Sequence, residues 1–337
     1  MAVRASFRRC AVPLAMVMLI AAGCGDDDEG STTTTTAPDT TQTTLAVPDG
    51  IEIGAGMNDP EDATIAVLQF MPAQVTVEAN APVTWVWTGA EPHSVTFLEP
   101  GQVLPPPGSD DSLFEPTPPT GAYDGTTFVN TGLQPLGPTS AEPFELTFSK
   151  AGSYAYYCVI HPQMVGEVEV VEAGGEVDTP AGVAQRRSAE AGEWLAEGRA
   201  AKAALVNAEP GQVENPDGTT TWTVEMGAAT EHTDILAFAP TPADARAGDT
   251  VTFVNNSTAP HTATFFGEGA EIIQSPLDPR AAEPAPGPSP QALSSSGLFN
   301  TGLLPPDAPP GAGPPVEARS FSFTVADPGS YAYVCLF

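Results

Sequence analysis

Short runs of alternating apolar and polar residues dominate the chain from about residue 63 onward. Within them β-branched and aromatic residues recur, and Pro, Gly and Asn separate one run from the next. This pattern is typical of strands. In the first half of the chain the predicted strands are 64–70, 74–78, 83–88, 94–98, 128–133, 144–149, 153–158 and 166–171. Short strands without helical periodicity between them predict a Greek-key β-sandwich, so the expected fold class is all-β.

The same succession of segments returns in the second half of the chain. Pro92-His93-Ser-Val-Thr-Phe97 is matched by Pro260-His261-Thr-Ala-Thr-Phe265. The strand that ends at Cys158 is matched by one that ends at Cys335. The histidines lie 168 residues apart and the cysteines 177, so a Pro-rich insertion is longer in the second copy. The repeat predicts two tandem sandwiches, over residues 61–173 and 217–337.

The second copy stops soon after its cysteine. Phe337 matches Ile160 of the first copy, which immediately precedes His161. We therefore expect the second sandwich to be truncated at its C-terminal end and the natural chain to continue. Without its last strand, this sandwich would expose an unpaired sheet edge.

Between the copies, residues 174–216 are predicted to form a linker. The segment Val183–Val206 is rich in Ala, Glu and Arg, and its apolar residues recur at roughly helical spacing. We expect one amphipathic helix there, with Trp194 packed on one of the two sandwiches.

Two segments of unusual composition precede the first sandwich. Residues 1–23 begin with arginines, continue with a short apolar run and end in small residues, which predicts a secretory signal. The ending before Cys24 resembles a bacterial lipoprotein cleavage site, which implies a lipidated Cys24 and an extracytoplasmic protein anchored to the cell membrane. Ordinary signal cleavage with a free Cys24 is the alternative. Residues 24–60, rich in Asp and Thr, predict a disordered tether.

The charge balance excludes some partners. The chain has 11 Lys and Arg against 42 Asp and Glu, a formal net charge of −31. Binding to nucleic acid or to anionic lipid through a polybasic patch needs a basic surface that this composition does not supply. An acidic protein instead favours a partner protein with a basic docking surface.

Cysteine usage indicates a metal. Cys10 and Cys24 belong to the predicted signal region, and Cys158 and Cys335 each end a predicted strand. No pair remains for a disulfide framework, although the chain carries an export signal. One cysteine kept in each domain is better explained as a metal ligand than as a buried apolar thiol.

The residues around Cys158 indicate which metal. His161 and Met164 follow it at intervals of three residues. A thiolate, an imidazole and a thioether suit copper in a blue electron-transfer site, once a second imidazole joins them. His93, at the start of a predicted strand, is the expected supplier.

With these motifs the chain resembles the cupredoxins, and the Cys-x2-His-x2-Met spacing resembles the short ligand loop of the amicyanin type. The resemblance implies a type 1 copper site of His93, Cys158, His161 and an axial Met164. It also implies that the backbone N–H of Ser94 donates to the thiolate. In the family the second histidine has an exposed edge through which electrons pass. The apolar surface around it would here be supplied by Val159, Ile160, Pro162 and Val165. In the second copy His261 and Cys335 would form a partial site.

These observations favour a membrane-anchored, one-electron carrier that is not an enzyme. The alternatives are a fragment of a two-domain cupredoxin enzyme, such as a nitrite reductase or multicopper oxidase, and a copper-binding protein without redox function. The enzymes need further histidines, whereas this sequence has only His93, His161, His232 and His261. His232 is expected to be a lone exposed histidine. A copper chaperone would cluster its methionines, whereas here they are scattered.

Overall fold

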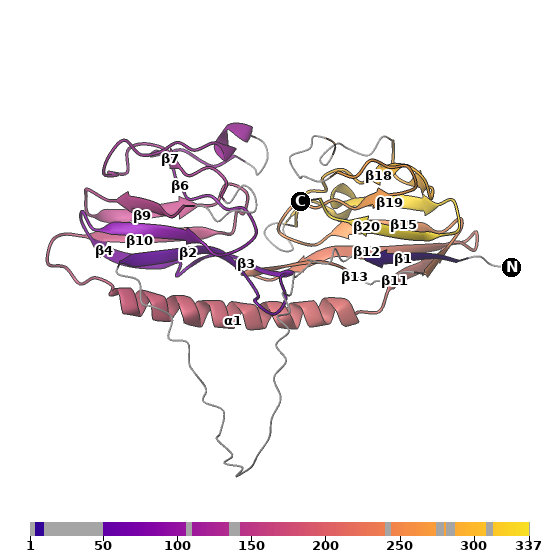
Figure 1. Cartoon of the computed structure of the whole chain (residues 1–337), viewed down its shortest axis with the longest axis horizontal. Coiled ribbons are helices and arrows are strands. Elements are labelled where there is room, and N and C mark those ends of the chain that lie inside the picture. The colour runs from indigo at the N-terminus through magenta and orange to yellow at the C-terminus, as the bar shows by residue number, and fades with distance from the viewer. Residues whose placement is uncertain are drawn as a thin grey trace, which may run out of the picture.

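The computed structural model describes residues 4–9, 50–105, 110–134, 142–239, 244–273, 280, 287–307 and 313–336. These residues form two β-sandwiches that lie side by side, with one long helix running beneath both (Figure 1). The predicted all-β class is therefore correct for the two sandwiches.

The first sandwich has two layers. One sheet has the strand order β4 (Gln74–Glu78), β10 (Val165–Val171), β9 (Gly152–Tyr157), β6 (Thr96–Phe97) and β7 (Val129–Asn130). The facing layer has the order β3 (Ile65–Met71), β2 (Ile51–Asn58), β5 (Pro82–Trp87) and β8 (Phe144–Thr147). A short 3-10 helix, η1 (Asp111–Phe114), lies in the Pro-rich insertion.

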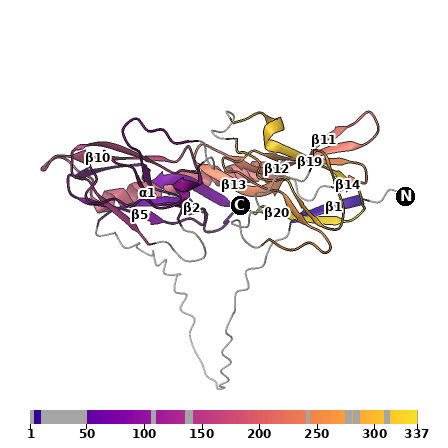
Figure 2. The same cartoon turned by 90° about the horizontal axis from the view of Figure 1, so that it is seen from above.

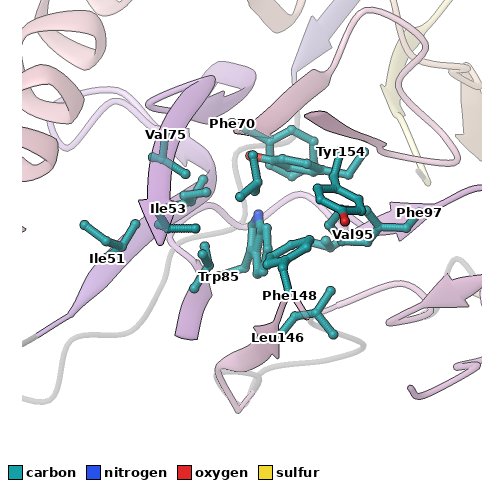
Figure 3. Packing of buried hydrophobic residues seen from close by; sticks show 14 of the residues in the cluster. Ile51, Ile53, Phe70, Val75, Trp85, Val95, Phe97, Leu146, Phe148 and Tyr154 are labelled. Carbon is teal, nitrogen blue, oxygen red and sulfur yellow. The ribbon is translucent and has the colours of Figure 1, made fainter. Parts of the chain in front are cut away.

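Apolar side chains, which alternate along the strands, fill the space between these layers. Trp85 on β5 and Tyr156 on β9 are fully buried, and their ring centroids are 5.2 Å apart. Phe97 packs edge-on against Trp85, with 5.8 Å between centroids. Figure 3 shows the aromatic side chains gathered around Trp85, with Ile51 and Ile53 from β2 beside them. Each large apolar side chain buried here contributes about 1.5–3 kcal/mol to stability.

Strand β2 corrects one prediction. It lies within residues 24–60, which we expected to be a disordered tether. Ile51, Ile53 and Ala55 alternate into the core, and β2 pairs with both β3 and β5. Gly54 and Gly56 lower the β-propensity of this segment, so the sequence pattern did not predict a strand here. The tether prediction is wrong for residues 51–58, and residues 24–49 lie outside the described part of the chain.

The second sandwich repeats this plan. One layer has the order β17 (Gln291–Leu293), β19 (Ser320–Val325), β15 (Thr250–Asn255), β12 (Thr220–Ala229) and β13 (Thr233–Ala239), with β11 (Gly211–Glu214) paired to β12. The other layer has the order β14 (Asp244–Arg246), β1 (Arg4–Arg9), β20 (Ser330–Val334), β16 (Thr264–Phe266) and β18 (Leu298–Asn300). A 3-10 helix, η2 (Val316–Arg319), precedes β19.

Strand β1 fills the place that the second copy leaves open. It lies between β14 and β20, as β10 lies between β4 and β9 in the first sandwich. Its direction is reversed, because it is antiparallel to β14 and parallel to β20. The expected unpaired edge is therefore absent, because part of the predicted signal segment covers it. The rest of that segment and Cys24 lie outside the described residues.

The two sandwiches share one sheet. β3 and β13 pair antiparallel, and Ala66 lies opposite Asp234, its counterpart in the repeat. Two equivalent hydrogen bonds flank this pair. Leu68 N–H donates to the carbonyl of His232 (3.0 Å), and Leu236 N–H donates to that of Thr64 (2.7 Å). The domains are therefore related by a pseudo-twofold axis through this pair, and their equivalent sheets form a single ten-stranded sheet.

Helix α1 (Pro180–Asn207) covers the joint (Figures 1 and 2). Thr179 caps its first turn by accepting the Gly182 N–H. Leu195 is buried with Ile65 of β3 and Ile235 of β13 in one apolar cluster. The predicted helix thus exists, and it contacts strands of both sandwiches.

Trp194 and His232 meet at this joint. Their rings stack with centroids 4.7 Å apart and planes 10° apart, and Nδ1 of His232 lies 3.2 Å from Oε2 of Glu197. His232 is half-buried, so the prediction of an exposed histidine is wrong.

Ion pairs fasten α1 to the first sandwich. Arg187 binds Glu52 (2.5 Å), Arg199 binds Asp59 (2.5 Å) and Lys202 binds Asp62. The hydrogen bond from the Arg199 guanidinium lowers the pKa of the Asp59 carboxyl. Among the described helices, none is long and apolar enough to cross a membrane.

Two glycines of α1 test the importance of this joint. A Cβ at Gly198 would lie 2.6 Å from Cγ2 of Ile65 and 3.2 Å from Oγ1 of Thr233, whereas a Cβ at Gly192 would meet nothing within 4 Å. We expect Gly192→Ala to stabilise the protein by up to about 1 kcal/mol through helix propensity. Gly198→Ala should be about 1–3 kcal/mol less stable than Gly192→Ala, because its methyl group overpacks the joint. Urea unfolding of both variants measures the difference, and coincident midpoints would refute the proposed packing.

Candidate metal centre

The four predicted copper ligands come from two places in the first sandwich. Cys158 directly follows β9, and His161 and Met164 lie in the loop before β10. Two backbone hydrogen bonds close this loop, from Cys158 N–H to the Met164 carbonyl (3.1 Å) and from Met164 N–H to the His161 carbonyl (2.9 Å). His93 enters from the segment before β6.

Three donor atoms converge. Nδ1 of His93 lies 3.0 Å from Nδ1 of His161, and Sγ of Cys158 lies 3.5 Å from Nδ1 of His161 and 4.0 Å from that of His93. Each of the three residues is at most 2% exposed, and Met164 is fully buried in the adjoining core. In the described part of the chain this is the only group of three His, Cys, Asp or Glu side chains close enough to hold an ion.

Burial also sets the protonation of these ligands. It lowers the pKa of His161 to about 4 and that of His93 well below 6.5, so both imidazoles are neutral at pH 7. Burial raises the pKa of the Cys158 thiol. A metal that binds here would therefore meet two neutral imidazoles, and the ionisation that it requires is the loss of one proton from sulfur.

The predicted hydrogen bond to the sulfur is present. Ser94 N–H donates to Sγ of Cys158 at 3.4 Å. The hydroxyl of Ser94 accepts the N–H of Val159 (2.9 Å) and is bonded to Oγ1 of Thr96 (2.9 Å). Such outer contacts hold a ligating sulfur in place and tune its donor strength.

Hydrogen bonds hold the backbone of His93, and close packing holds its ring. Its backbone forms a reciprocal pair of hydrogen bonds with Gln134, each 2.8 Å long, and its carbonyl also accepts Nε1–H of Trp87 at 3.2 Å. The ring lies against Gly56 in the bulge of β2, so close that a Cβ on Gly56 would fall 2.0 Å from Nε2 of His93. Gly56 is the contact that sequence reasoning missed, because it lay inside the predicted tether.

Comparison with known proteins agrees with this site. Residues 59–171 match the family of copper-binding proteins that includes plastocyanin and azurin. The first sandwich is a cupredoxin.

Amicyanin from Paracoccus versutus is 29% identical over 119 residues, which cover 34% of this chain and 70% of amicyanin. Its crystal structure is 26% identical over 36% of this chain and 82% of amicyanin, with a TM-score of 0.21. A purple cupredoxin from Nitrosopumilus maritimus is 24% identical over 36% of this chain and 99% of its own, with a TM-score of 0.22.

The donor set fits the metal of this family. Two neutral imidazole nitrogens and a thiolate, with a thioether beside them, are the ligands of blue copper sites. His93, Cys158, His161 and Met164 of this cupredoxin are therefore positioned to form one type 1 copper site.

The exposure of His161 differs from what the resemblance implied. His161 is only 2% exposed, so it lacks the solvent-exposed edge that the resemblance implied. Of the expected apolar surface, Pro162 and Val165 are exposed, Ile160 is half-buried and Val159 is buried. The ligand loop instead contacts the second sandwich, where Nε2 of Gln163 donates to Oγ1 of Thr258 at 2.7 Å.

The second sandwich reproduces half of the site. Nδ1 of His261 lies 3.3 Å from Sγ of Cys335, and Thr262 N–H donates to that sulfur at 3.4 Å, as Ser94 does in the first sandwich. A cavity of about 50 Å³ beside the pair is also lined by Met226.

Substitution of Gly56 tests how closely the fold holds His93. Gly56→Ala should displace the imidazole, and we expect copper to be retained at least tenfold less well in competition with a chelator. Gly101→Ala is the matched control, because Gly101 also has a positive φ (+83°, against +67° at Gly56) but a Cβ there meets nothing within 4 Å. Equal copper retention by the two variants would show that the position of the His93 imidazole does not depend on Gly56.

Proposed function

We propose that this protein is a membrane-anchored, extracytoplasmic blue copper protein that carries single electrons. The observation that carries the proposal is that the Nδ1 atoms of two neutral imidazoles, His93 and His161, converge with the sulfur of Cys158 in a buried site. The likeness of the first sandwich to amicyanin supports it. Bound copper would supply the one-electron change between its two oxidation states.

The protein's own residues supply rigidity. Ser94 holds the sulfur, Gly56 and Gln134 hold His93, and the two hydrogen bonds of the ligand loop hold His161 and Met164. Burial keeps water from the donor atoms. A site that changes shape little between oxidation states exchanges electrons at a low reorganisation cost, so a rigid scaffold suits a carrier better than it suits an enzyme that must admit a substrate.

The proposed lipid anchor is supported by the composition of the first part of the chain. Arginines, a short apolar run and small residues before Cys24 support export and lipidation, and the Asp- and Thr-rich segment after Cys24 supports a tether. Such processing would remove Arg4–Arg9 and so free the sheet position between β14 and β20.

Copper titration tests the carrier. The protein should bind copper in the first sandwich and show an intense thiolate-to-copper absorption that disappears on reduction and returns on oxidation. Cys158→Ser should abolish this band, because the sulfur is its source, whereas Cys335→Ser should leave it in place. A colourless copper complex of the unsubstituted protein, or a band that survives Cys158→Ser, would contradict the proposal.

Ionic strength tests the nature of the partner. The full sequence has a net charge of −31, and removal of residues 1–23, which carry three arginines, would make it −34, so the protein should be steered toward a basic docking surface. The second-order rate of electron exchange with its physiological partner should then fall as salt rises through the range in which the Debye length shrinks from about 30 to 10 Å. Stopped-flow measurements check this, and a rate that does not depend on salt would rule out a basic partner surface.

A further inference from the structure

A chain of hydrogen bonds leads from the ligand loop into the second sandwich. Gln163 Nε2 donates to Thr258 Oγ1 (2.7 Å), and Thr258 Oγ1 donates to Oδ2 of Asp234 (3.0 Å). Ser257 Oγ donates to the same Oδ2 (2.9 Å) and lies 2.8 Å from Nε2 of His261. Thr258, Asp234 and Ser257 are at most 1% exposed, and His261 is 6% exposed.

Asp234 sets the direction of every bond in this chain. A carboxylate only accepts, so the Thr258 hydroxyl donates to it. The Ser257 hydroxyl also donates to it, because Oδ2 of Asp234 (2.9 Å) is nearer than the other acceptor in reach, the carbonyl of Ala259 (3.2 Å). Their oxygens are then left to accept from Nε2–H of His261 and from the amide nitrogen of Gln163. His261 is thereby held with its proton on Nε2 and its Nδ1 lone pair toward Cys335. The orientation of the Gln163 amide is fixed in the same way.

The first sandwich has no such chain. Ala66, Gly89 and Ala90 occupy the positions that correspond to Asp234, Ser257 and Thr258. Correspondingly, Nε2 of His93 has no hydrogen-bond partner among the described residues. A buried carboxylate is costly unless its oxygens are satisfied, and here they accept two hydroxyls and the Thr258 N–H. The polar groups are therefore a feature of one copy that the shared fold does not require.

We propose that Asp234 is a positioning residue for the copper centre and couples it to the second sandwich. Through Thr258, Asp234 holds Gln163, which lies between the ligands His161 and Met164. Through Ser257 it holds His261 beside Cys335. The second sandwich thus takes part in setting the geometry of the ligand loop. This inference rests on the proposed function of the first sandwich.

Thr258→Val in the full copper-loaded protein tests the link. It keeps the shape of the side chain but removes the hydroxyl that binds both Gln163 and Asp234. Loss of an outer contact of this kind typically weakens metal retention tenfold or more, and we expect at least tenfold in chelator competition. We also expect a shift of the midpoint potential, because Met164, which would contribute its thioether to bound copper, lies on the released loop. A tenfold difference between the two oxidation states corresponds to about 59 mV.

Two further variants separate positioning from stability. Thr252→Val is the matched control, because Thr252 shares a hydroxyl hydrogen bond of 2.9 Å with Ser322 in the same sandwich, between β15 and β19. It should leave retention and potential unchanged. Thr258→Ser keeps the hydroxyl and should restore both values. Equal behaviour of Thr258→Val and Thr252→Val would overturn the inference, as would failure of Thr258→Ser to restore them.

A readout without copper completes the test. In the metal-free protein, nitrogen NMR should find the proton of His261 on Nε2, and Ser257→Ala should abolish that preference. If the unsubstituted protein and Ser257→Ala show the same mixture of His261 tautomers, the inferred hydrogen bond from His261 to Ser257 is wrong. Absence of blue copper from the unsubstituted protein would instead refute the proposed function, so the two failures are distinguishable.

Discussion

The pairing of β3 with β13 is the interaction on which the rest of the structure depends. It joins two equivalent sheets at Ala66 and Asp234 and makes one layer continuous through both domains. Helix α1 then seals the joint, with Leu195 in the shared apolar cluster and Gly198 against both strands. Because sheet and helix both cross the boundary, the two sandwiches hold a defined relative position. Two domains on a flexible linker would not.

That fixed arrangement changes the setting of the copper centre. Here Gln163 contacts Thr258 of the second sandwich, and His161 is almost fully buried. The centre is therefore built from the ligands and hydrogen bonds of one domain but lies beside the other. The pseudo-twofold axis also brings the half-site of His261 and Cys335 to the same side of the joint as the copper loop.

The two copies have also diverged in how they support their first histidine. His93 is wedged against the backbone of Gly56, with its Nε2 left without a partner among the described residues. His261 is instead held by Ser257 and Asp234. One copy uses close packing and the other a polar chain, although both present Nδ1 to a cysteine sulfur whose hydrogen bond comes from the next residue's N–H.

The sequence by itself determined most of the strands, the repeat and the ligand types, because these depend on local alternation and on short spacings. The interval from Cys158 to Met164 and the motif at His93 were sufficient to predict the copper donors, and the resemblance to the cupredoxins implied the hydrogen bond from Ser94. Strand β2 was missed because Gly54 and Gly56 lower its β-propensity, although Ile51, Ile53 and Ala55 alternate. Only the tertiary structure showed that β3 pairs with β13, that α1 contacts both domains, that His161 is buried and that Asp234 lies between the two sites. These features arise from contacts between segments that are distant in the chain, such as Ile65 with Ile235 and Gln163 with Thr258, and no local pattern in a single sequence encodes which distant edges will meet.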